Sequence, residues 1–427
     1  MPNQSPLKIL IAGAGIAGPS LAFWLQRLGH SVTIIERWSS LRTGGQQLDI
    51  RGQGIEAIER MGIIQDVRRH VVDEAGVDIV DHNGESLIFF PRYEAGSKHQ
   101  AVSSEYEIMR GDLCQILYDR TKDKVVYKFG LSVQEFEHKG HAVSVTLSDG
   151  STADCDLLVG ADGQSSRIRR ALNKDVGGDE QFIQSTGVFT CYYSIKRQAE
   201  DKNRATCCFE TGQRCLITRW HTPHLGQVYL MTMAPGHQAE MKAALAKDVT
   251  AQKDTFTDMF RTARYKQTSR LLDAMKTTDD FYANEVVHVL NNAWSKGRVV
   301  LLGDAAFCPS SMSGKGTSAA MVGAYVLAGE IARCSGGDCD VEAALARYST
   351  TLHPYIDQMP KSNPGLAWMI PKSRTRLKAL NLALRLASKC NVPKLVQRFT
   401  APDKDEWVMP WYEELHVGEE AVSVVNK

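Results

Sequence analysis

The sequence lacks any excess of charge of one sign. Its 427 residues carry 50 Lys and Arg against 49 Asp and Glu, a formal net charge of +1. A nucleic-acid binder needs a basic surface that displaces counterions, so this balance argues against that class of function. Low-complexity stretches and internal repeats are also missing. The 43% hydrophobic and 23% charged residues are typical of a folded globular protein, and the length suggests two or three domains.

Metal-binding and targeting signals are lacking as well. The 10 cysteines form no CxxC pair and the 12 histidines form no HExxH motif, so we expect no bound metal. The N-terminus has no basic region before its short apolar run, which argues against a signal peptide. No stretch approaches the roughly 20 apolar residues of a membrane span. These absences favour a cytoplasmic protein with reduced thiols and no integral membrane segment.

What the sequence does contain, near its start, is a βαβ unit over residues 7–36. Within it, Gly13 permits a tight turn, Gly15 lets a pyrophosphate approach the backbone, and Gly18 allows close packing of helix on strand. Glu36 ends the second strand, where a carboxylate accepts hydrogen bonds from an adenosine ribose and disfavours a 2′-phosphate. The unit therefore predicts a site for FAD or NAD(H).

A second glycine-rich loop lies far along the chain. A buried strand over residues 298–303 leads to Asp304, and the segment 313–317 then opens a helix. A nucleotide-triphosphatase loop would require Ser or Thr directly after Lys315 and a glycine where Pro309 stands, so that interpretation fails. A long cofactor, with its diphosphate at one loop and its ring at another, explains two such loops. FAD is therefore favoured over NAD(H).

Strand patterns dominate residues 180–240, and Asn83-Gly84 between two short apolar runs predicts a hairpin. We therefore expect an α/β fold, with a Rossmann-type FAD-binding domain interrupted by a β-rich substrate-binding domain and followed by a C-terminal helical region. The expected limits are 1–73, 101–176 and 285–345 for the FAD-binding domain, 74–100 and 177–284 for the substrate-binding domain, and 346–427 for the helical region.

Three ordered motifs carry a family resemblance. Residues 13–18, 162–169 and 303–306 match the GxGxxG, DGxxSxxR and GDAA fingerprints of the group A flavoprotein monooxygenases. Segments 44–50 and 107–113 resemble the branch that contains the tetracycline-inactivating monooxygenases. The resemblance covers roughly residues 7–335 and specifies no substrate.

The resemblance implies site residues on both sides of the flavin. Glu36 would hold the ribose, Asp304 the pyrophosphate and ribityl chain, and Gly314 and Gly316 would lie beside the ring. The implied cofactor-binding residues are Gly13, Gly15, Ala17, Gly18, Glu36, Arg37, Arg42, Gly45, Arg110, Asp162, Asp304, Gly314, Gly316 and Thr317. The implied substrate contacts are Tyr192, Arg214, Tyr229 and Met231, and no catalytic side chain is identified.

Each of these assignments has a plainer structural alternative. Asp162 could end a strand in an ordinary turn, Arg110 could be a surface charge, and Asp304 could be a helix N-cap. The four substrate-side residues could be ordinary core or surface residues.

The sequence also departs from the family pattern. Phe307 stands where the family usually has His, and Gly323 and Cys114 replace an Asp and an Arg. Ser310-Ser311 replace a proline pair, and Ser318 replaces an Asn. These changes remove polar groups that the family places beside the ring.

The implied function is hydroxylation by an FAD-dependent monooxygenase. NADPH or NADH would reduce FAD, O2 would form a flavin hydroperoxide, and its distal oxygen would pass to an electron-rich phenolic or enolic, possibly polycyclic, small molecule. Secondary metabolism or xenobiotic inactivation would be its setting, and a monomer or weak dimer is expected. The rivals are a flavin-dependent halogenase, of whose WxWxIP motif only residues 368–371 remain, and a flavin-binding protein without turnover.

The tail poses a separate question. Residues 372–402 contain eight Lys or Arg, several interleaved leucines and no acidic residue. Such a helix could lie on an anionic membrane. We favour a helix that packs its leucine face over the α/β domain.

Overall fold

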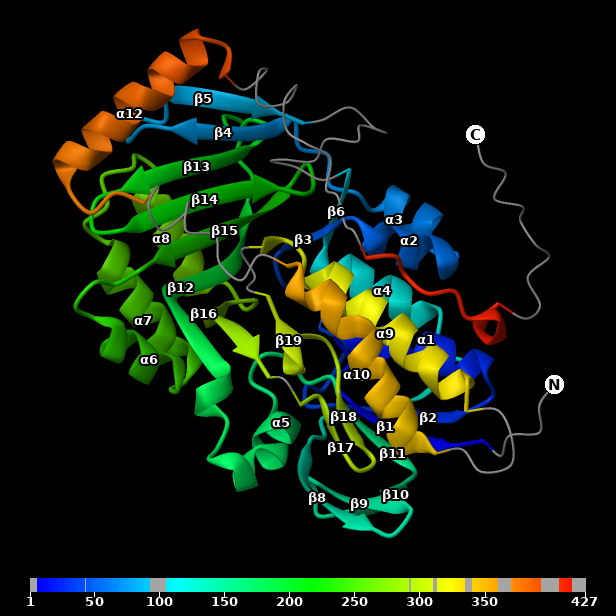
Figure 1. Cartoon of the computed structure of the whole chain (residues 1–427). Coiled ribbons are helices and arrows are strands. Elements are labelled where there is room, and N and C mark those ends of the chain that lie inside the picture. The colour runs from blue at the N-terminus through cyan, green and yellow to red at the C-terminus, as the bar shows by residue number, and fades with distance from the viewer. Residues whose placement is uncertain are drawn as a thin grey trace, which may run out of the picture.

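The computed structural model describes residues 6–42, 44–92, 105–291, 293–309, 313–334, 340–359, 370–392 and 407–416. Within these ranges the chain forms two large sheets, each covered by its own helices, with the chain crossing repeatedly between them (Figure 1). This is the mixed α/β architecture that the sequence predicted. The expected halogenase remnant at 368–371 and the pair Ser310-Ser311 lie wholly or partly outside the described residues.

The first large sheet is the Rossmann-type sheet, parallel except at its edge strand. Its strands, in sheet order, are β17 (Ser295–Lys296), β18 (Val299–Leu301), β11 (Leu157–Gly160), β1 (Lys8–Ala12), β2 (Ser31–Glu36) and β7 (Val126–Phe129). Helices α1 (Ala17–Arg27), α4 (Arg110–Asp119) and α9 (Gly316–Ala332) lie on one side of it, with α10 (Val341–Asp357), α2 (Gln53–Arg60) and α3 (Ile64–Arg69) beyond (Figure 1). The other side carries α5 (Arg167–Leu172) and a small sheet of β8 (Val133–Lys139), β9 (Ala142–Leu147) and β10 (Thr152–Cys155).

Helix α9 occupies the centre of this domain and is buried over almost its whole length. Its many Gly and Ala residues let neighbouring elements approach closely. A Cβ on Gly329 would lie 2.2 Å from the ring of Tyr412, whose hydroxyl donates to Glu330 at 2.7 Å. The C-terminal segment around Tyr412 therefore fits against the helix that begins at the second glycine loop.

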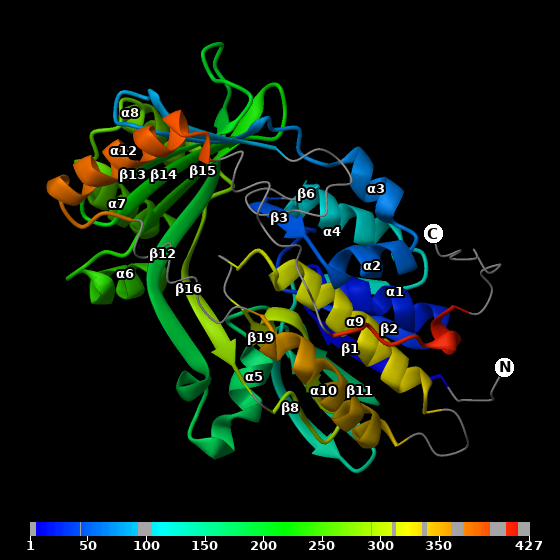
Figure 2. The same cartoon turned by 45° about the horizontal axis from the view of Figure 1, so that its top comes forward.

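The second large sheet has eight strands; helices cover one of its faces, and the other face is turned towards the Rossmann-type domain (Figure 2). In sheet order they are β19 (Phe307–Cys308), β16 (Tyr282–Leu290), β12 (Ile183–Lys196), β15 (Leu225–Thr232), β14 (Arg214–Trp220), β13 (Ala205–Glu210), β4 (Gly76–Val80) and β5 (Ser86–Pro91). Helices α6 (Gln238–Leu245), α7 (Val249–Phe260) and α8 (Thr268–Thr277) cover one face. The predicted hairpin at Asn83-Gly84 is confirmed, since it joins β4 to β5.

Strand β19 belongs to this sheet although it directly follows residues 303–306, which come after the Rossmann-type strand β18. Phe307 pairs with Leu290 and Cys308 with Val289 of β16. The strand after the GDAA residues thus forms an edge of the eight-stranded sheet.

Two further differences from the expected organisation concern boundaries and the tail. β16 runs to Leu290, past the limit expected at 284, and α10 crosses the limit expected at 345. Helix α12 (Arg374–Lys389) packs its leucines against the eight-stranded sheet next to β5, not over the α/β domain as expected. The apolar side chains of β4 and β5 on this face pack against the helix, which covers them.

Candidate functional site

The first glycine turn brings two of the sequence motifs into contact. Gly13 has φ +115°, and a Cβ there would lie 2.3 Å from the carbonyl oxygen of Ala161. A Cβ on Gly18 would lie 2.1 Å from the carbonyl oxygen of Gly13. Both distances exclude any larger residue. The N-terminus of α1 therefore sits directly against the end of β11, where Asp162 follows.

Glu36 lies at the end of β2 and faces this turn. Its carboxylate accepts the backbone N–H of Ala14 at 2.8 Å and that of Trp38 at 3.0 Å. Each oxygen retains a second acceptor position. The carboxylate is therefore held at the rim of the turn, where a hydroxyl of a bound nucleotide can reach it.

Two guanidinium groups lie on the other side of the turn. A Cβ on Gly15 would lie 3.4 Å from Nη2 of Arg110, and a Cβ on Gly45 would lie 3.0 Å from its Cδ. Nη1 of Arg110 is buried and has no hydrogen-bond partner in the described part of the chain. Burial and then the charge of Arg110 lower the pKa of Arg42, so the two cations share one region. An anion between them and the free N–H groups of α1 would satisfy both.

Asp304 lies in the short turn Gly303–Ala305. Its side chain does not cap a described helix, which was the alternative role considered for it. A Cβ on Gly303 would lie 2.9 Å from the Cβ of Ala17, so the turn abuts α1. The side chain is solvent-exposed, yet desolvation by the surrounding protein raises its pKa, against the opposing effects of Cys308 and Arg110. No side chain caps α9, where Gly316 faces the carboxylate and Thr317 follows in the first turn. The Asp304 carboxylate thus lies between the starts of α1 and α9.

Arg169 joins the remaining motifs, and its guanidinium is completely buried. It forms a two-pronged ion pair with Asp179 at 2.8 and 3.0 Å. It also donates to the carbonyl oxygens of Ala305 at 3.0 Å and Gln164 at 2.6 Å. The DG loop and the GDAA turn are therefore fixed to one another by a single side chain.

Asp162 occupies the DG loop itself. Its Oδ2 accepts the backbone N–H of Arg167 at 2.8 Å, while Oδ1 is buried with no partner in the described residues. An ordinary strand-ending turn would satisfy both oxygens with protein or water. The orphaned oxygen fits a hydroxyl or N–H donor from a bound molecule.

Across the site, the eight-stranded sheet presents three tyrosines. The rings of Tyr192 and Tyr229 meet edge to face at 4.9 Å, and Tyr282 lies nearly parallel to Tyr192 at 6.3 Å. The guanidinium of Arg42 lies 4.3 Å from the centre of the Tyr282 ring. Two predicted substrate-side residues thus face the cofactor-side cations. Tyr282 was missed because it lies at the start of β16, where the sequence shows no motif.

The other two predicted substrate contacts lie on opposite faces of the sheet. Arg214 points to the helix-covered face, where it donates to the carbonyl oxygen of Met259 at 2.6 Å and to Thr262 at 2.9 Å. Met231 follows Tyr229 by two residues on β15, so it shares the face of Tyr229, and it packs against the apolar cluster that α12 also contacts. Alternate residues of a strand face opposite sides, so Arg219, an odd number of positions from Arg214, faces the flavin-domain side. Arg214 is therefore replaced by Arg219 as the arginine on that face.

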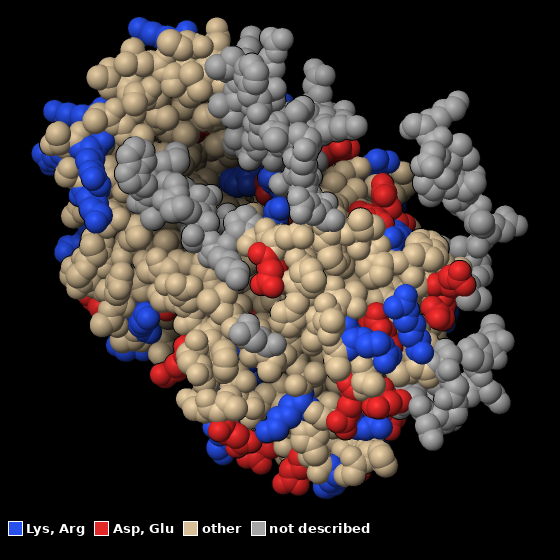
Figure 3. Space-filling view, in the orientation of Figure 1, with Lys and Arg blue, Asp and Glu red and all other residues tan. Residues whose placement is uncertain are grey.

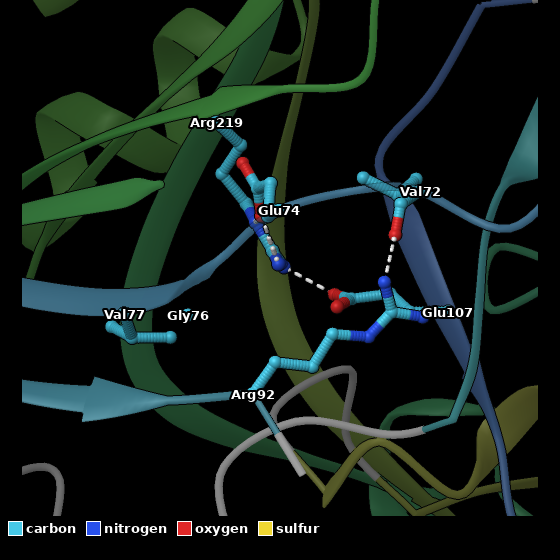
Figure 4. A pocket seen from close by; sticks show the side chains of 7 residues that line it. All are labelled: Val72, Glu74, Gly76, Val77, Arg92, Glu107 and Arg219. Carbon is cyan, nitrogen blue, oxygen red and sulfur yellow. Dashed lines mark hydrogen bonds and ion pairs between the residues drawn. The ribbon is translucent and has the colours of Figure 1, made fainter. Parts of the chain in front are cut away.

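Arg219 belongs to a buried charge cluster that lines a small pocket between the two domains (Figure 4). It pairs with Glu74 at 2.6 Å and Glu107 at 2.5 Å, and Glu74 also accepts the backbone N–H of Trp220. Arg92 enters from the opposite side and donates to the carbonyl oxygen of Val72 (Figure 4).

Buried polar side chains adjoin this charge cluster on the antiparallel pair β3 (Gln47–Ile50) and β6 (Tyr106–Met109). The backbone N–H of Gln47 donates to the hydroxyl of Tyr229 at 3.0 Å. Both amide atoms of the Gln47 side chain, and Oδ1 of Asp49, are buried without a partner among the described residues, and we call these two side chains the Gln47 group. A Cβ on Gly314 would lie 3.0 Å from Oδ2 of Asp49, so the Gln47 group lies beside the second glycine loop. Sequence reasoning missed both side chains, although segment 44–50 was noted.

The family departures have a packing explanation. Phe307 is 2% exposed, and its ring packs at a tilt against the ring of Trp294. A Cβ on Gly323 would lie 3.0 Å from the tip of the Phe307 ring. The two departures are therefore one exchange, in which a small residue on α9 makes room for a large one on β19. Cys114 is buried in α4.

The residues present fit FAD by these observations. The glycines of the first turn have no room for a Cβ, so the backbone there is open to a close-packed ligand. Arg110, Arg42 and the starts of α1 and α9 could bind a diphosphate. Buried polar atoms of Arg110 and Asp162 have no partner in the described residues and could be satisfied by the same ligand. Arg37, also predicted, is exposed and lies over the Trp38 ring at the rim.

Comparisons with known proteins agree. The FAD binding domain family matches residues 6–362. The FAD-dependent monooxygenase asL4 of Sarocladium schorii is 36% identical over 96% of this chain and 99% of its own length. The flavin-dependent monooxygenase eupH of a Phoma species is 36% identical over 92% of this chain and 94% of its own. The crystal structure of tetracycline destructase Tet(51) is similar to this structure with a TM-score of 0.74 and 28% sequence identity, and the match covers 96% of this chain and 100% of that one. The chain therefore belongs to the FAD-dependent monooxygenases, in the branch of the fold that includes the tetracycline destructases.

Proposed function

We propose that the protein uses NADPH or NADH and O2 to hydroxylate an electron-rich phenolic or enolic small molecule, possibly polycyclic. The observation that carries this proposal is the placement of the tyrosine-lined sheet face directly opposite the glycine and arginine cradle. One oxygen atom of O2 would enter the substrate and the other would leave as water, with two electrons from the nicotinamide.

The chain's own residues divide into holding and orienting groups. Arg110 and Arg42 hold the diphosphate, Glu36 the ribose and Asp304 the ribityl hydroxyls. The backbone at Gly314 and Gly316 borders the ring. FAD, when bound, supplies oxygen activation and transfer. The protein keeps the substrate at the ring and excludes water.

Substrate recognition is proposed for the Gln47 group and the tyrosines beside it. The Gln47 amide offers one donor and one acceptor side by side, which complements a hydroxyl next to a carbonyl. Tyr192 and Tyr229 offer aromatic edges and faces to a flat ring system. The buried, unpaired state of these polar atoms is costly without a ligand, which supports a role in binding one.

The test begins with the purified protein. Denaturation should release FAD into the supernatant, and oxidation of NADPH or NADH should rise sharply when a phenolic or enolic substrate is added. Nicotinamide oxidation that ignores every member of a broad panel would favour a flavin-binding protein without turnover. A product that requires chloride would favour a halogenase. Buried cysteines such as Cys191 and Cys208 are free thiols, which supports a cytoplasmic setting as part of this proposal.

Arg110→Met should weaken FAD binding roughly ten- to a hundredfold, because one charge-assisted pair with the diphosphate is lost. Titration of the apoprotein with FAD, followed by flavin fluorescence, measures this dissociation constant. Arg120→Met, at the exposed end of the same helix, is the control and should leave it unchanged. Equal affinities of both variants would remove Arg110 from the site.

A further inference from the structure

Helix α12 lies on the surface and has one face attached to the eight-stranded sheet. Leu377, Leu380 and Leu384 pack against the core cluster next to β5. Arg385 pairs with Asp81 at 2.9 Å, which ties the flank of the helix to the β4–β5 turn. None of its residues is fully buried. The inner face of α12 thus contacts the sheet, and its outer face is exposed.

The outer face carries a row of two leucines with a lysine at each end. Lys378, Leu382, Leu386 and Lys389 follow one another at spacings of four, four and three, so they lie on one side of the helix. Leu382 is 60% exposed and Leu386 is 53% exposed. The packed leucines lie on the opposite side. Two leucines flanked by lysines therefore point straight into solvent.

The charge of this region differs from that of the chain as a whole. Residues 370–392 contain six Lys or Arg and no Asp or Glu, while the complete chain has a net charge of +1. Apart from Arg385, these cations have no carboxylate partner within the described residues. Figure 3 shows Lys and Arg side chains around the outline of α12, at the upper left. The region is strongly basic on a nearly neutral molecule.

We propose that the outer face of α12 docks the enzyme on an anionic lipid surface, with the helix lying in the plane of the interface. Leu382 and Leu386 would enter the boundary between headgroups and acyl chains, and Lys378 and Lys389 would extend to the lipid phosphates. No described helix is long and apolar enough to span a membrane, so the contact is peripheral. A second copy is disfavoured as occupant, because a symmetric contact would bring the same cations together. This inference does not depend on the proposed substrate.

The test is cosedimentation of the complete protein with vesicles. One set is phosphatidylcholine alone and the other is an equimolar mixture with phosphatidylglycerol. Binding should be confined to the anionic set and should fall steeply with added salt. Because each basic residue near such a surface contributes about fivefold in partitioning, Lys378→Glu with Lys389→Glu should lower it roughly twenty-five-fold or more.

Two further variants separate the contributions. Leu382→Ser with Leu386→Ser should lower binding and leave its salt dependence in place. Lys139→Glu with Lys174→Glu, on the far small sheet and its neighbouring turn, should change nothing. All variants should keep the parental melting temperature, since the altered side chains are exposed. Absent binding, equal binding to both vesicle sets, or equal loss in both lysine pairs would overturn the proposal. Self-association abolished by the Lys378 and Lys389 variant would overturn it in favour of a protein contact.

Discussion

Arg169→Met is expected to lower the free energy of unfolding by about 3–5 kcal/mol. The side chain of Arg169 is fully buried, and that of Asp179 is 5% exposed. Removing the guanidinium leaves a buried carboxylate without its partner, together with the unsatisfied carbonyl oxygens of Gln164 and Ala305. Because these carbonyls belong to the two cofactor loops, flavin retention should fall as well.

Urea unfolding followed by far-ultraviolet circular dichroism measures this loss. Arg170→Met is the matched control, since Arg170 is exposed on the same short helix, and it should cost under about 0.5 kcal/mol. Adding Asp179→Leu to Arg169→Met should recover much of the loss, because the stranded charge is then gone. A loss below about 1 kcal/mol for Arg169→Met would mean that Arg169 is not needed to hold the DG loop and the GDAA turn together.

Arg219→Met should be similarly damaging, by about 3–5 kcal/mol near neutral pH. Arg219 neutralises Glu74 and Glu107, whose side chains are 4% and 11% exposed. Without it, two carboxylates would face one another across the pocket of Figure 4. Repulsion between buried like charges drives protonation.

This loss should depend on pH with a definite sign. Burial already raises the pKa of Glu74 against the opposing effect of Arg219, so removing Arg219 raises it further. A raised folded-state pKa means that the folded protein binds more protons than the unfolded chain between the two values. Stability is therefore retained below the unfolded carboxyl pKa of about 4.3 and lost as the pH rises through the folded one.

Melting temperatures of Arg219→Met and the parent protein across the acid-to-neutral range provide the check. The gap between them should be smallest at the acid end and widen towards neutral pH. Arg261→Met, which breaks an exposed pair with Asp258, should show a smaller gap without this widening. A gap that stays constant with pH would mean that Glu74 does not titrate in this way.

The cofactor side of the site could be predicted because its constraints are local. Gly13 and Gly18 are excluded from carrying a side chain by backbone atoms a few residues away or on the adjoining strand. Such requirements leave fixed spacings in the sequence. The loops that carry Asp162 and Asp304 follow buried strands of one parallel sheet, and parallel strands end at the same edge.

The substrate side could not be predicted with the same certainty, because a strand has two faces. β14 is covered on both sides, by helices and by the other domain, so its sequence does not reveal which alternate residues face the flavin. The sequence indicated Arg214 and passed over Arg219, and it is the hydrogen bond of Arg214 to Met259 of α7 that separates the two faces. Similarly, the loss of a family histidine at Phe307 looked functional. It is compensated by Gly323 on α9, the next α-helix along the chain, and this contact is visible only in the packing.

The pairing of β19 with β16 bears on how such an enzyme can change its substrate. Asp304 stands a few residues before Phe307, and the latter is hydrogen-bonded into the sheet that carries the three tyrosines. The spacing between the Asp304 turn and the sheet that carries the tyrosines is therefore set by main-chain pairing, which side-chain substitutions other than those to proline leave in place. Side chains of this sheet can change while its distance from the Asp304 turn stays the same. The same fold can thus change the ligand that its sheet binds while the position of the Asp304 turn is kept.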